Sequence, residues 1–317
     1  MKLGFAVKVV GREGLKSNDS RRWQNNPHLS VSLAYLRDIF LYLRDAGIKM
    51  YRLSSDLAPY VTHPEFSQFH RQIEDCAGEL AAIGEMARQA DLRLSFHPAA
   101  FVVLNAVDQT VAQKSVADFE AQSRILDLMG LGAEAVMVTH VGGAYGDKAE
   151  SMRRFVERYR ALPEPVKRRL VLENDERNYT LGDAYAIHEQ TGIRLVFDQL
   201  HELCNPTPGL TLHEALGRAL DTWPDGQTPK IHYSTTRTAM VETDEGQQQK
   251  ARLHEPRLSQ HADLIDPFAF IEFVRGAEGL RDFDAMLECK AKDVALLRLR
   301  RHLSQMAPEL IQKWHIE

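Results

Sequence analysis

The sequence predicts an α/β protein folded as a single (β/α)8 TIM barrel over residues 1–317. Three observations favour this class. Eight short, β-branched apolar runs alternate with longer amphipathic stretches along the whole chain. The average of about 40 residues for each strand and helix is typical of such barrels with some loop insertions. No Gly-x-Gly-x-x-Gly motif follows the first run, which argues against the alternative of a doubly wound open sheet.

The expected elements follow one another in strict alternation. The predicted strands are apolar runs at residues 3–9, 50–55, 92–98, 135–140, 170–175, 194–200, 230–235 and 285–290. The predicted helices have apolar residues at three- and four-residue intervals and lie at residues 33–46, 69–90, 116–129, 149–162 and 181–190. The polar stretch 235–260 is expected to be a long loop between the seventh and eighth units. No linker or repeat divides the chain, so we expect one domain.

Composition excludes several classes of protein. Hydrophobic residues make up 44% and charged residues 26% of the chain, as in an ordinary soluble globular protein. No apolar run reaches the ~20 residues that span a bilayer, and the N-terminus reads as a strand rather than a signal peptide. The three cysteines form no Cys-x-x-Cys pair, which argues against a disulfide framework and favours the cytoplasm. A net charge of −5 argues against a histone-like nucleic-acid binder but permits a DNA enzyme that holds metal ions.

Histidines and carboxylates mark the ends of the predicted strands from the third to the eighth. In a barrel these ends converge on one face, where barrel active sites lie. Imidazole and carboxylate ligands suit zinc, manganese or iron. Any one of these residues could be an ordinary hydrogen-bonded side chain, but such a cluster would be costly without ions. The candidate ligands are His97, His140, Glu173, Asp198, His201, His232 and Glu288.

Lys230 lies two residues before His232 on one predicted strand, so both side chains point to the same side. Lys230 could pair with a phosphate or carboxylate, or it could be a carboxylated lysine that acts as an anionic ligand. His254 in the long loop stays undecided. The remaining histidines outside strand ends are expected to be structural; they are His28, His70, His188, His213, His302 and His315.

With these residues in place, the chain resembles the ultraviolet-damage endonuclease family, DNA-repair enzymes related to endonuclease IV within the xylose-isomerase-like barrels. LENDER, at residues 172–177, is the most specific motif. The resemblance runs in order from about residue 3 to about residue 295. The matching pieces are YRLSSDLAPYVTHP, LSFHPAAFVVLN, THVGGAYGDK, LENDERNY, LVFDQLHELCNP, PKIHYS and ECKAKD.

The resemblance implies a metal-dependent DNA-repair endonuclease with three divalent ions, often manganese, although zinc, magnesium or cobalt would also suit the ligands. It adds His261 to the seven candidate ligands and makes His63 a candidate phosphate or catalytic contact. By analogy, Glu173 bridges two ions. The implied reaction is cleavage of the DNA backbone 5′ to ultraviolet photoproducts and other lesions by a metal-activated hydroxide. The candidate catalytic residues are Glu173, His63 and Lys230.

The implied partner is damaged double-stranded DNA, with no membrane and no obligate protein partner. Family members carry a Gln and an aromatic residue shortly after the His-Pro of the first ligand. Here these positions are Ala100 and Phe101, so the aromatic is kept and the Gln is absent. The candidate DNA contacts are Phe5, Ala100, Phe101, Tyr145, Lys148 and Arg237, and further candidate phosphate contacts are Lys8, Arg12, Arg21 and Arg22.

Two alternatives stay open at this point. A sugar isomerase or epimerase could use the same barrel, but LENDER and the additional histidines His201 and His261 count against it. A divergent, catalytically silent DNA-binding homologue would keep the barrel without the reaction.

Overall fold

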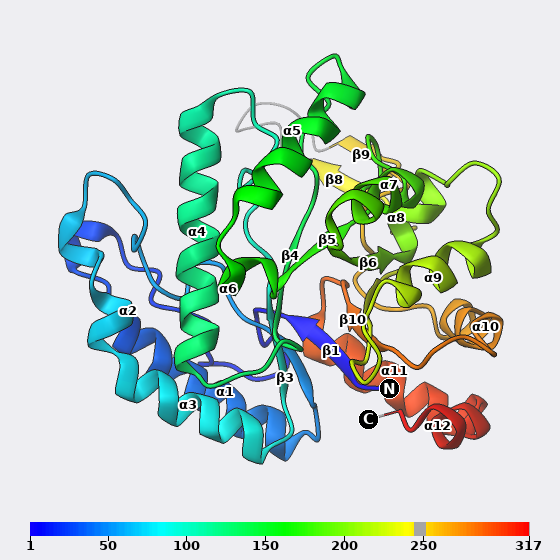
Figure 1. The fold of residues 1–317 in the computed structure, drawn as a ribbon. Helices are drawn as coiled ribbons and strands as arrows, with labels where there is room; N and C mark the ends of the chain where they lie inside the picture. The colour runs from blue at the N-terminus through cyan, green and yellow to red at the C-terminus, as the bar shows by residue number, and fades with distance from the viewer. Residues whose placement is uncertain (244–251, 317) are drawn as a thin grey trace.

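The computed structural model describes residues 1–243 and 252–316. Eight parallel strands close into a barrel in the order β1, β10, β7, β6, β5, β4, β3 and β2 (Figure 1). The strands of the barrel are β1 (Leu3–Ala6), β2 (Met50–Arg52), β3 (Arg93–Phe96), β4 (Val136–Thr139), β5 (Leu170–Glu173), β6 (Arg194–Asp198), β7 (Lys230–Tyr233) and β10 (Asp284–Leu287). The predicted TIM barrel is therefore confirmed, and each of its strands lies within a predicted run or one residue beyond it.

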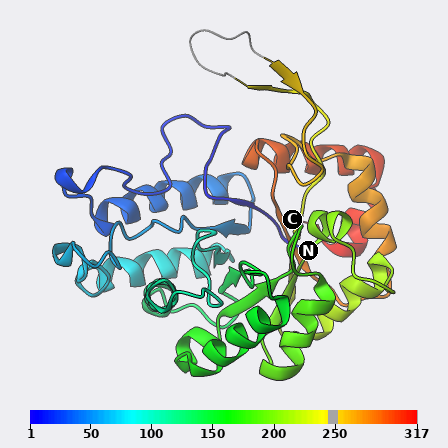
Figure 2. The ribbon, with the colours of Figure 1, turned by 90° about the horizontal axis from the view of Figure 1, so that it is seen from above.

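Helices surround the barrel (Figures 1 and 2). Local sequence sets their ends: α7, for example, begins with a capping box between Thr180 and Asp183 and ends at Gly192, whose φ is 72°. The helices are α1 (Leu29–Asp45), α2 (Gln72–Asp75), α3 (Ala77–Gln89), α4 (Gln109–Leu128), α5 (Lys148–Ala161), α6 (Glu164–Lys167), α7 (Leu181–Thr191), α8 (Gln199–Cys204), α9 (Leu212–Asp221), α10 (Pro267–Gly276), α11 (Lys292–Met306) and α12 (Pro308–Trp314).

The barrel strands are buried on both faces, because side chains fill the interior and the helices cover the outside. The N-terminal end of the barrel contains a buried ion pair between Arg93 at the start of β3 and Asp284 at the start of β10, 2.8 Å apart. The C-terminal ends of the strands carry the polar side chains of the candidate site. The two ends of the chain also meet, since the Met1 ammonium donates to the carbonyl of Trp314 at 2.6 Å (Figure 1).

Two segments differ from the sequence prediction. The helix expected over residues 69–90 is divided into α2 and α3 at Cys76, and the buried Gln72 anchors α2 through hydrogen bonds with the backbone of Pro59 and Leu29. The loop expected over residues 235–260 contains an antiparallel hairpin of β8 (Val241–Thr243) and β9 (Arg252–His254). Figure 2 shows this hairpin standing away from the barrel. Residues 244–251 lie outside the described residues.

The part of the chain that the structure describes contains no helix with both the length and the apolar character needed to cross a membrane.

Candidate metal centre

Glu173, the last residue of β5, lies at the centre of the site and is fully enclosed. Its Oε1 accepts a hydrogen bond from His232 Nδ1 of β7 at 2.8 Å. Its Oε2 lies 3.1 Å from His97 Nε2, which follows β3, and 3.5 Å from His140 Nε2, which follows β4. Closure of the barrel thus brings side chains from three other strands around the carboxylate of Glu173.

Two overlapping groups have ligand atoms close enough to hold an ion. The first group contains His97, Glu173 and His232. The second group contains Glu173, Asp198, His232 and Glu288. Within each group the possible ligand atoms lie within 4.8 Å of one another. His232 Nδ1 lies 3.3 Å from Glu288 Oε1 and 4.0 Å from Asp198 Oδ2. Glu173 and His232 belong to both groups, and Glu173 is the one whose two oxygens face different imidazoles, His232 at Oε1 and His97 at Oε2.

Hydrogen bonds at the start of α8 hold the Asp198 side chain in position beside Glu173 and His232. Asp198 ends β6 and is the N-cap of α8, and its Oδ1 accepts the backbone N–H of His201 at 2.9 Å. Asn174 accepts the Asp198 N–H at 2.8 Å. Asp198 Oδ2 is buried and has no hydrogen-bond partner among the described residues. An unpaired carboxylate oxygen is costly in a protein interior, so this atom and its imidazole neighbours fit a divalent cation.

His201 and His261 lie beside the two groups. His201 Nδ1 is 3.8 Å from Asp198 Oδ1 and 3.6 Å from Glu173 Oε1. His261 Nε2 is 3.8 Å from Glu288 Oε2, and the rings of His201 and His261 are 6.4 Å apart. All eight ligands expected from the sequence and the resemblance therefore lie together, although His140, His201 and His261 are outside the two compact groups.

The electrostatics of the site follow from burial and from the close approach of like and unlike charges. Burial lowers the pKa of His232 to about 3, and burial raises the pKa of Asp198 to about 7. Burial also acts to raise the pKa of Glu173, but the neighbouring His232 and His140 outweigh it and hold that pKa well below its usual range. The site therefore presents a neutral imidazole and an ionised carboxylate at its centre, which are the forms that bind metals.

Sequence reasoning missed Arg52, the last residue of β2. Its guanidinium contacts Glu288 Oε1 and lies 2.9 Å from His232 Nε2. It had the same signal as the other candidates, a polar residue at a strand end. The contact with Glu288, together with that of His232, holds the pKa of Glu288 well below its usual range against the effect of burial.

Lys230 lies inside the barrel, as the spacing to His232 predicts. It is fully buried, and its Nζ donates to Ser95 Oγ at 3.0 Å. Burial and the nearby cations Arg52 and Arg93 hold the pKa of Lys230 well below its ordinary value. His63 is half-buried and stacks on Phe66 with ring centroids 4.1 Å apart, beside a cavity that adjoins the site.

The candidate DNA contacts divide by exposure. Phe101 is 75% exposed and Tyr145 is 52% exposed, and Ala100 is exposed next to Phe101. Lys148 pairs with Asp183 at 2.6 Å, and Arg237 lies 3.8 Å from Asp263. The prediction for Phe5 is wrong. Its side chain is fully buried in the middle of β1 and packs edge-on against Tyr51, so it has no surface to offer DNA.

Comparison with known proteins decides the family. A family model described as UV-endonuclease UvdE matches residues 21–313. The chain belongs to the UV-endonuclease family. A UV DNA damage endonuclease of Bacillus velezensis is 35% identical over 294 residues, which cover 90% of this chain and 85% of that protein. A UV DNA damage endonuclease of Bacillus pumilus is 34% identical over 259 residues, covering 81% of this chain and 75% of that protein.

Solved structures agree with this membership of the UV-endonuclease family. The crystal structure of SacUVDE has a TM-score of 0.81 and 29% sequence identity, and the match covers 96% of this chain and 99% of that one. A D-tagatose 3-epimerase-like protein has a TM-score of 0.57 at 11% identity, with 99% of each chain covered. At this low identity the match with the epimerase-like protein shows a likeness of fold alone.

Proposed function

We propose that this protein is a metal-dependent endonuclease that hydrolyses the DNA backbone 5′ to ultraviolet photoproducts and other lesions, with the whole chain acting as one catalytic unit. The observation that carries this proposal is the carboxylate of Glu173, which three imidazoles approach within 3.5 Å at the mouth of the barrel. The relatives named as UV DNA damage endonucleases supply the substrate class.

The ligand set assigns residues to three ions, which we propose to be manganese. His97, His140 and Glu173 would hold the first ion, and Glu173, Asp198, His232 and Glu288 the second. His201 and His261 would hold the third at the edge of the cluster. When bound, clustered divalent ions supply an activated water and stabilise charge on the attacking and leaving oxygens.

In this proposal, side chains of the protein position the metal ligands and contact the DNA. Arg52 pairs with Glu288 and so holds that carboxylate beside His232 Nδ1. Asn174 and the start of α8 fix Asp198. Phe101, which is exposed shortly after His97 and Pro98, would stack on bases of the bound duplex.

The test is a nicking assay. Protein loaded with manganese is incubated with irradiated plasmid, with unirradiated plasmid and with ketose sugars. We expect nicks in irradiated plasmid only, loss of nicking with chelator, and recovery with manganese. Sugar turnover without nicking would support the epimerase alternative, and specific binding of irradiated DNA without nicking would indicate a silent homologue.

A further inference from the structure

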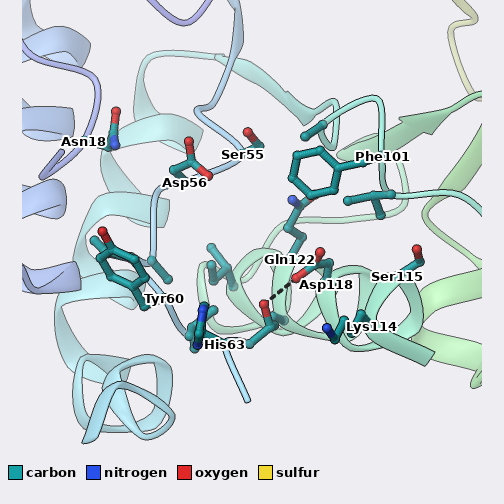
Figure 3. Close-up of a pocket in the computed structure, with 18 of the residues that line it drawn as sticks. Asn18, Ser55, Asp56, Tyr60, His63, Phe101, Lys114, Ser115, Asp118 and Gln122 are labelled. Atoms are coloured by element: carbon teal, nitrogen blue, oxygen red, sulfur yellow. Dashed lines mark hydrogen bonds between the residues drawn. The ribbon is translucent and has the colours of Figure 1, made fainter. Parts of the chain in front are cut away.

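Two neighbouring cavities adjoin the metal centre. The larger one, of about 860 Å³, reaches α4 and is lined there by Asp118 (Figure 3). The smaller one, of about 500 Å³, is lined by Lys8, Arg52 and the candidate ligand Glu288. Asp56 lines both cavities. The smaller cavity therefore brings two cationic side chains next to a candidate metal ligand, on the side of β1 and β2.

The backbone that carries Lys8 is strained. Val7, the residue directly after β1, has a φ of 63°, a left-handed conformation that a β-branched residue rarely adopts. The hydroxyl of Tyr51 donates to the Val7 carbonyl, and the Val7 N–H donates to the carbonyl of Arg52 at 3.0 Å, so contacts with β2 hold this conformation. Backbone strain of this kind is concentrated at active sites and ligand-binding sites.

A second strained residue, Lys292, follows the neighbouring strand. β10 pairs with β1 in the barrel, and Lys292 begins the helix α11 after β10 with a φ of 49°. Its side chain is half-buried. Burial lowers the pKa of Lys292, and the charges of Arg52 and Lys8 lower it further against the opposite effect of Glu288. Lys292 therefore lies close to the same group of charges as Lys8.

Asp293 holds the segment after β1 against the start of α11. Its fully buried carboxylate accepts the backbone N–H of Val10 at 2.7 Å, the backbone N–H of Gly11 at 3.0 Å and the hydroxyl of Tyr42 at 2.6 Å. A Cβ at Gly11 would lie 2.7 Å from Asp293 Oδ2, so a side chain there would push this carboxylate away. The hydrogen bonds of Asp293 thus fix the two lysine-bearing segments relative to each other.

The two lysines have no counter-charge of their own. Among the described residues, no carboxylate lies within ion-pair distance of the Nζ of Lys8 or Lys292, and neither Nζ donates a hydrogen bond. The Glu288 carboxylate already contacts Arg52 and lies 3.3 Å from His232 Nδ1. Like charges that are held near one another repel, and a bound anion would remove this cost.

We propose that Lys8 and Lys292 together bind one backbone phosphate of the DNA beside the metal centre. The inference rests on the proposed function, which brings DNA to the mouth of the barrel. Barrel enzymes frequently bind phosphate at the loops after their last strands, and β10 is the last strand of this barrel. Contacts with phosphate fix the register of a duplex without reading its sequence. The two lysines would hold the strand in register over the ions, in intact and damaged DNA alike.

The experiment measures DNA binding in chelator as a function of salt concentration. One phosphate contact contributes about 0.9 to the slope of log K against log salt. Lys292→Met should therefore make this slope shallower by about 0.9 and weaken binding about eightfold at ~0.1 M salt, which is that slope applied over the tenfold interval below ~1 M. The loss should be equal for damaged and intact duplex. Lys8→Met should act in the same direction, and the double variant should lose no more than about one contact, because both lysines meet the same phosphate.

Methylphosphonate substitution identifies the phosphate, because it replaces one charged group of the backbone by a neutral one. At one position near the cut, it should weaken binding by wild type as much as Lys292→Met does and leave binding by Lys292→Met unchanged. Free inorganic phosphate offers the same oxygens. The assignment to DNA is wrong if inorganic phosphate raises the Tm of wild type but not of Lys292→Met and no methylphosphonate position reproduces the loss.

The matched control is Lys167→Met, because Lys167 is also half-buried but lies on α6, before the start of β5 at the opposite end of the barrel. Lys292→Arg should keep the wild-type slope. Lys292→Gly, which suits a φ of 49°, should unfold no lower than wild type and bind as weakly as Lys292→Met.

An unchanged slope in both Lys292→Met and Lys292→Gly would overturn the inference. If wild type nicks irradiated plasmid while these slopes stay unchanged, this inference alone fails. A slope that depends on Lys292, in a protein that never nicks DNA, overturns only the proposed function.

Discussion

Substitution of Glu173 by Gln should weaken the metal binding that we propose for this protein while leaving its fold in place. Gln keeps the size of the side chain and loses the charge that faces His232 at 2.8 Å and His97 at 3.1 Å. Because Glu173 belongs to both compact groups of ligands, one substitution weakens both sites. Loss of the charge also removes the repulsion between Glu173 and the carboxylates of Asp198 and Glu288. The Tm of the metal-free variant should therefore lie within a few degrees of the Tm of the metal-free wild type.

The size of the effect follows from linkage between binding and folding. An ion present at ~100 times its Kd stabilises the folded state by about 2.7 kcal/mol for each site. A chain of 317 residues has an unfolding entropy near 0.7 kcal/mol/K on the average scale of ~2.1 cal/mol/K per residue. Each occupied site should therefore raise Tm by about 4 °C, and two sites by about 8 °C.

The assay is calorimetry with and without manganese, together with elemental analysis of bound metal. The matched control is Glu79→Gln, because Glu79 is exposed on α3 away from the strand ends. We expect a rise in Tm with manganese for wild type and for the control, and almost none for Glu173→Gln. A rise in the variant equal to that in wild type would refute the role of Glu173 as the shared ligand.

Three further predictions concern recognition, protons and Lys230. Phe101→Ala should lower the ratio of the nicking rate on irradiated plasmid to that on intact plasmid, and Ala100→Gln should raise this ratio. For Phe101→Ala, the loss of base stacking worth ~1–3 kcal/mol corresponds to roughly a 5- to 150-fold decrease in the ratio. The negative charges of Asp198, Glu173 and Glu288 outweigh the effect of burial and raise the pKa of His201 to about 9. The protonated imidazole therefore stabilises the metal-free fold. This stabilisation is complete below pH 6.5 and is lost as the pH rises through 9. Manganese binding at pH 7.5 should therefore release protons, seen as a dependence of binding enthalpy on buffer, and the number released should change in His201→Asn. Burial lowers the pKa of Lys230 and so favours the neutral amine, which should react with carbon dioxide through its Nζ to form a carbamate with loss of a proton. Carbon-13 bicarbonate should then give a carbamate NMR signal that Lys230→Met lacks, and absence of this signal from metal-loaded wild type would refute carboxylation.

The sequence by itself determined the order of strands and the residues at their ends. Alternation of apolar runs with amphipathic stretches depends only on neighbours in the chain, so a strand could be predicted at residues 170–175 with Glu173 near its C-terminal end, where the structure has β5 at Leu170–Glu173. The turn from Asp198 to His201 was equally local, since the N-cap of α8 joins those two residues directly. These signals were enough to predict that the candidate ligands lie on one face of a barrel.

Tertiary structure decided which of these side chains touch. Glu173 and His232 are 59 residues apart and meet at 2.8 Å only because the barrel closes. Closure also brings Arg52 against Glu288 and His232; its position at a strand end was visible in the sequence, but its partners were not. The burial of Phe5 has the same origin. Exposure and hydrogen bonding depend on atoms supplied by distant parts of the chain, so a local pattern cannot specify them, whereas the position of a residue along a strand is specified by its neighbours alone.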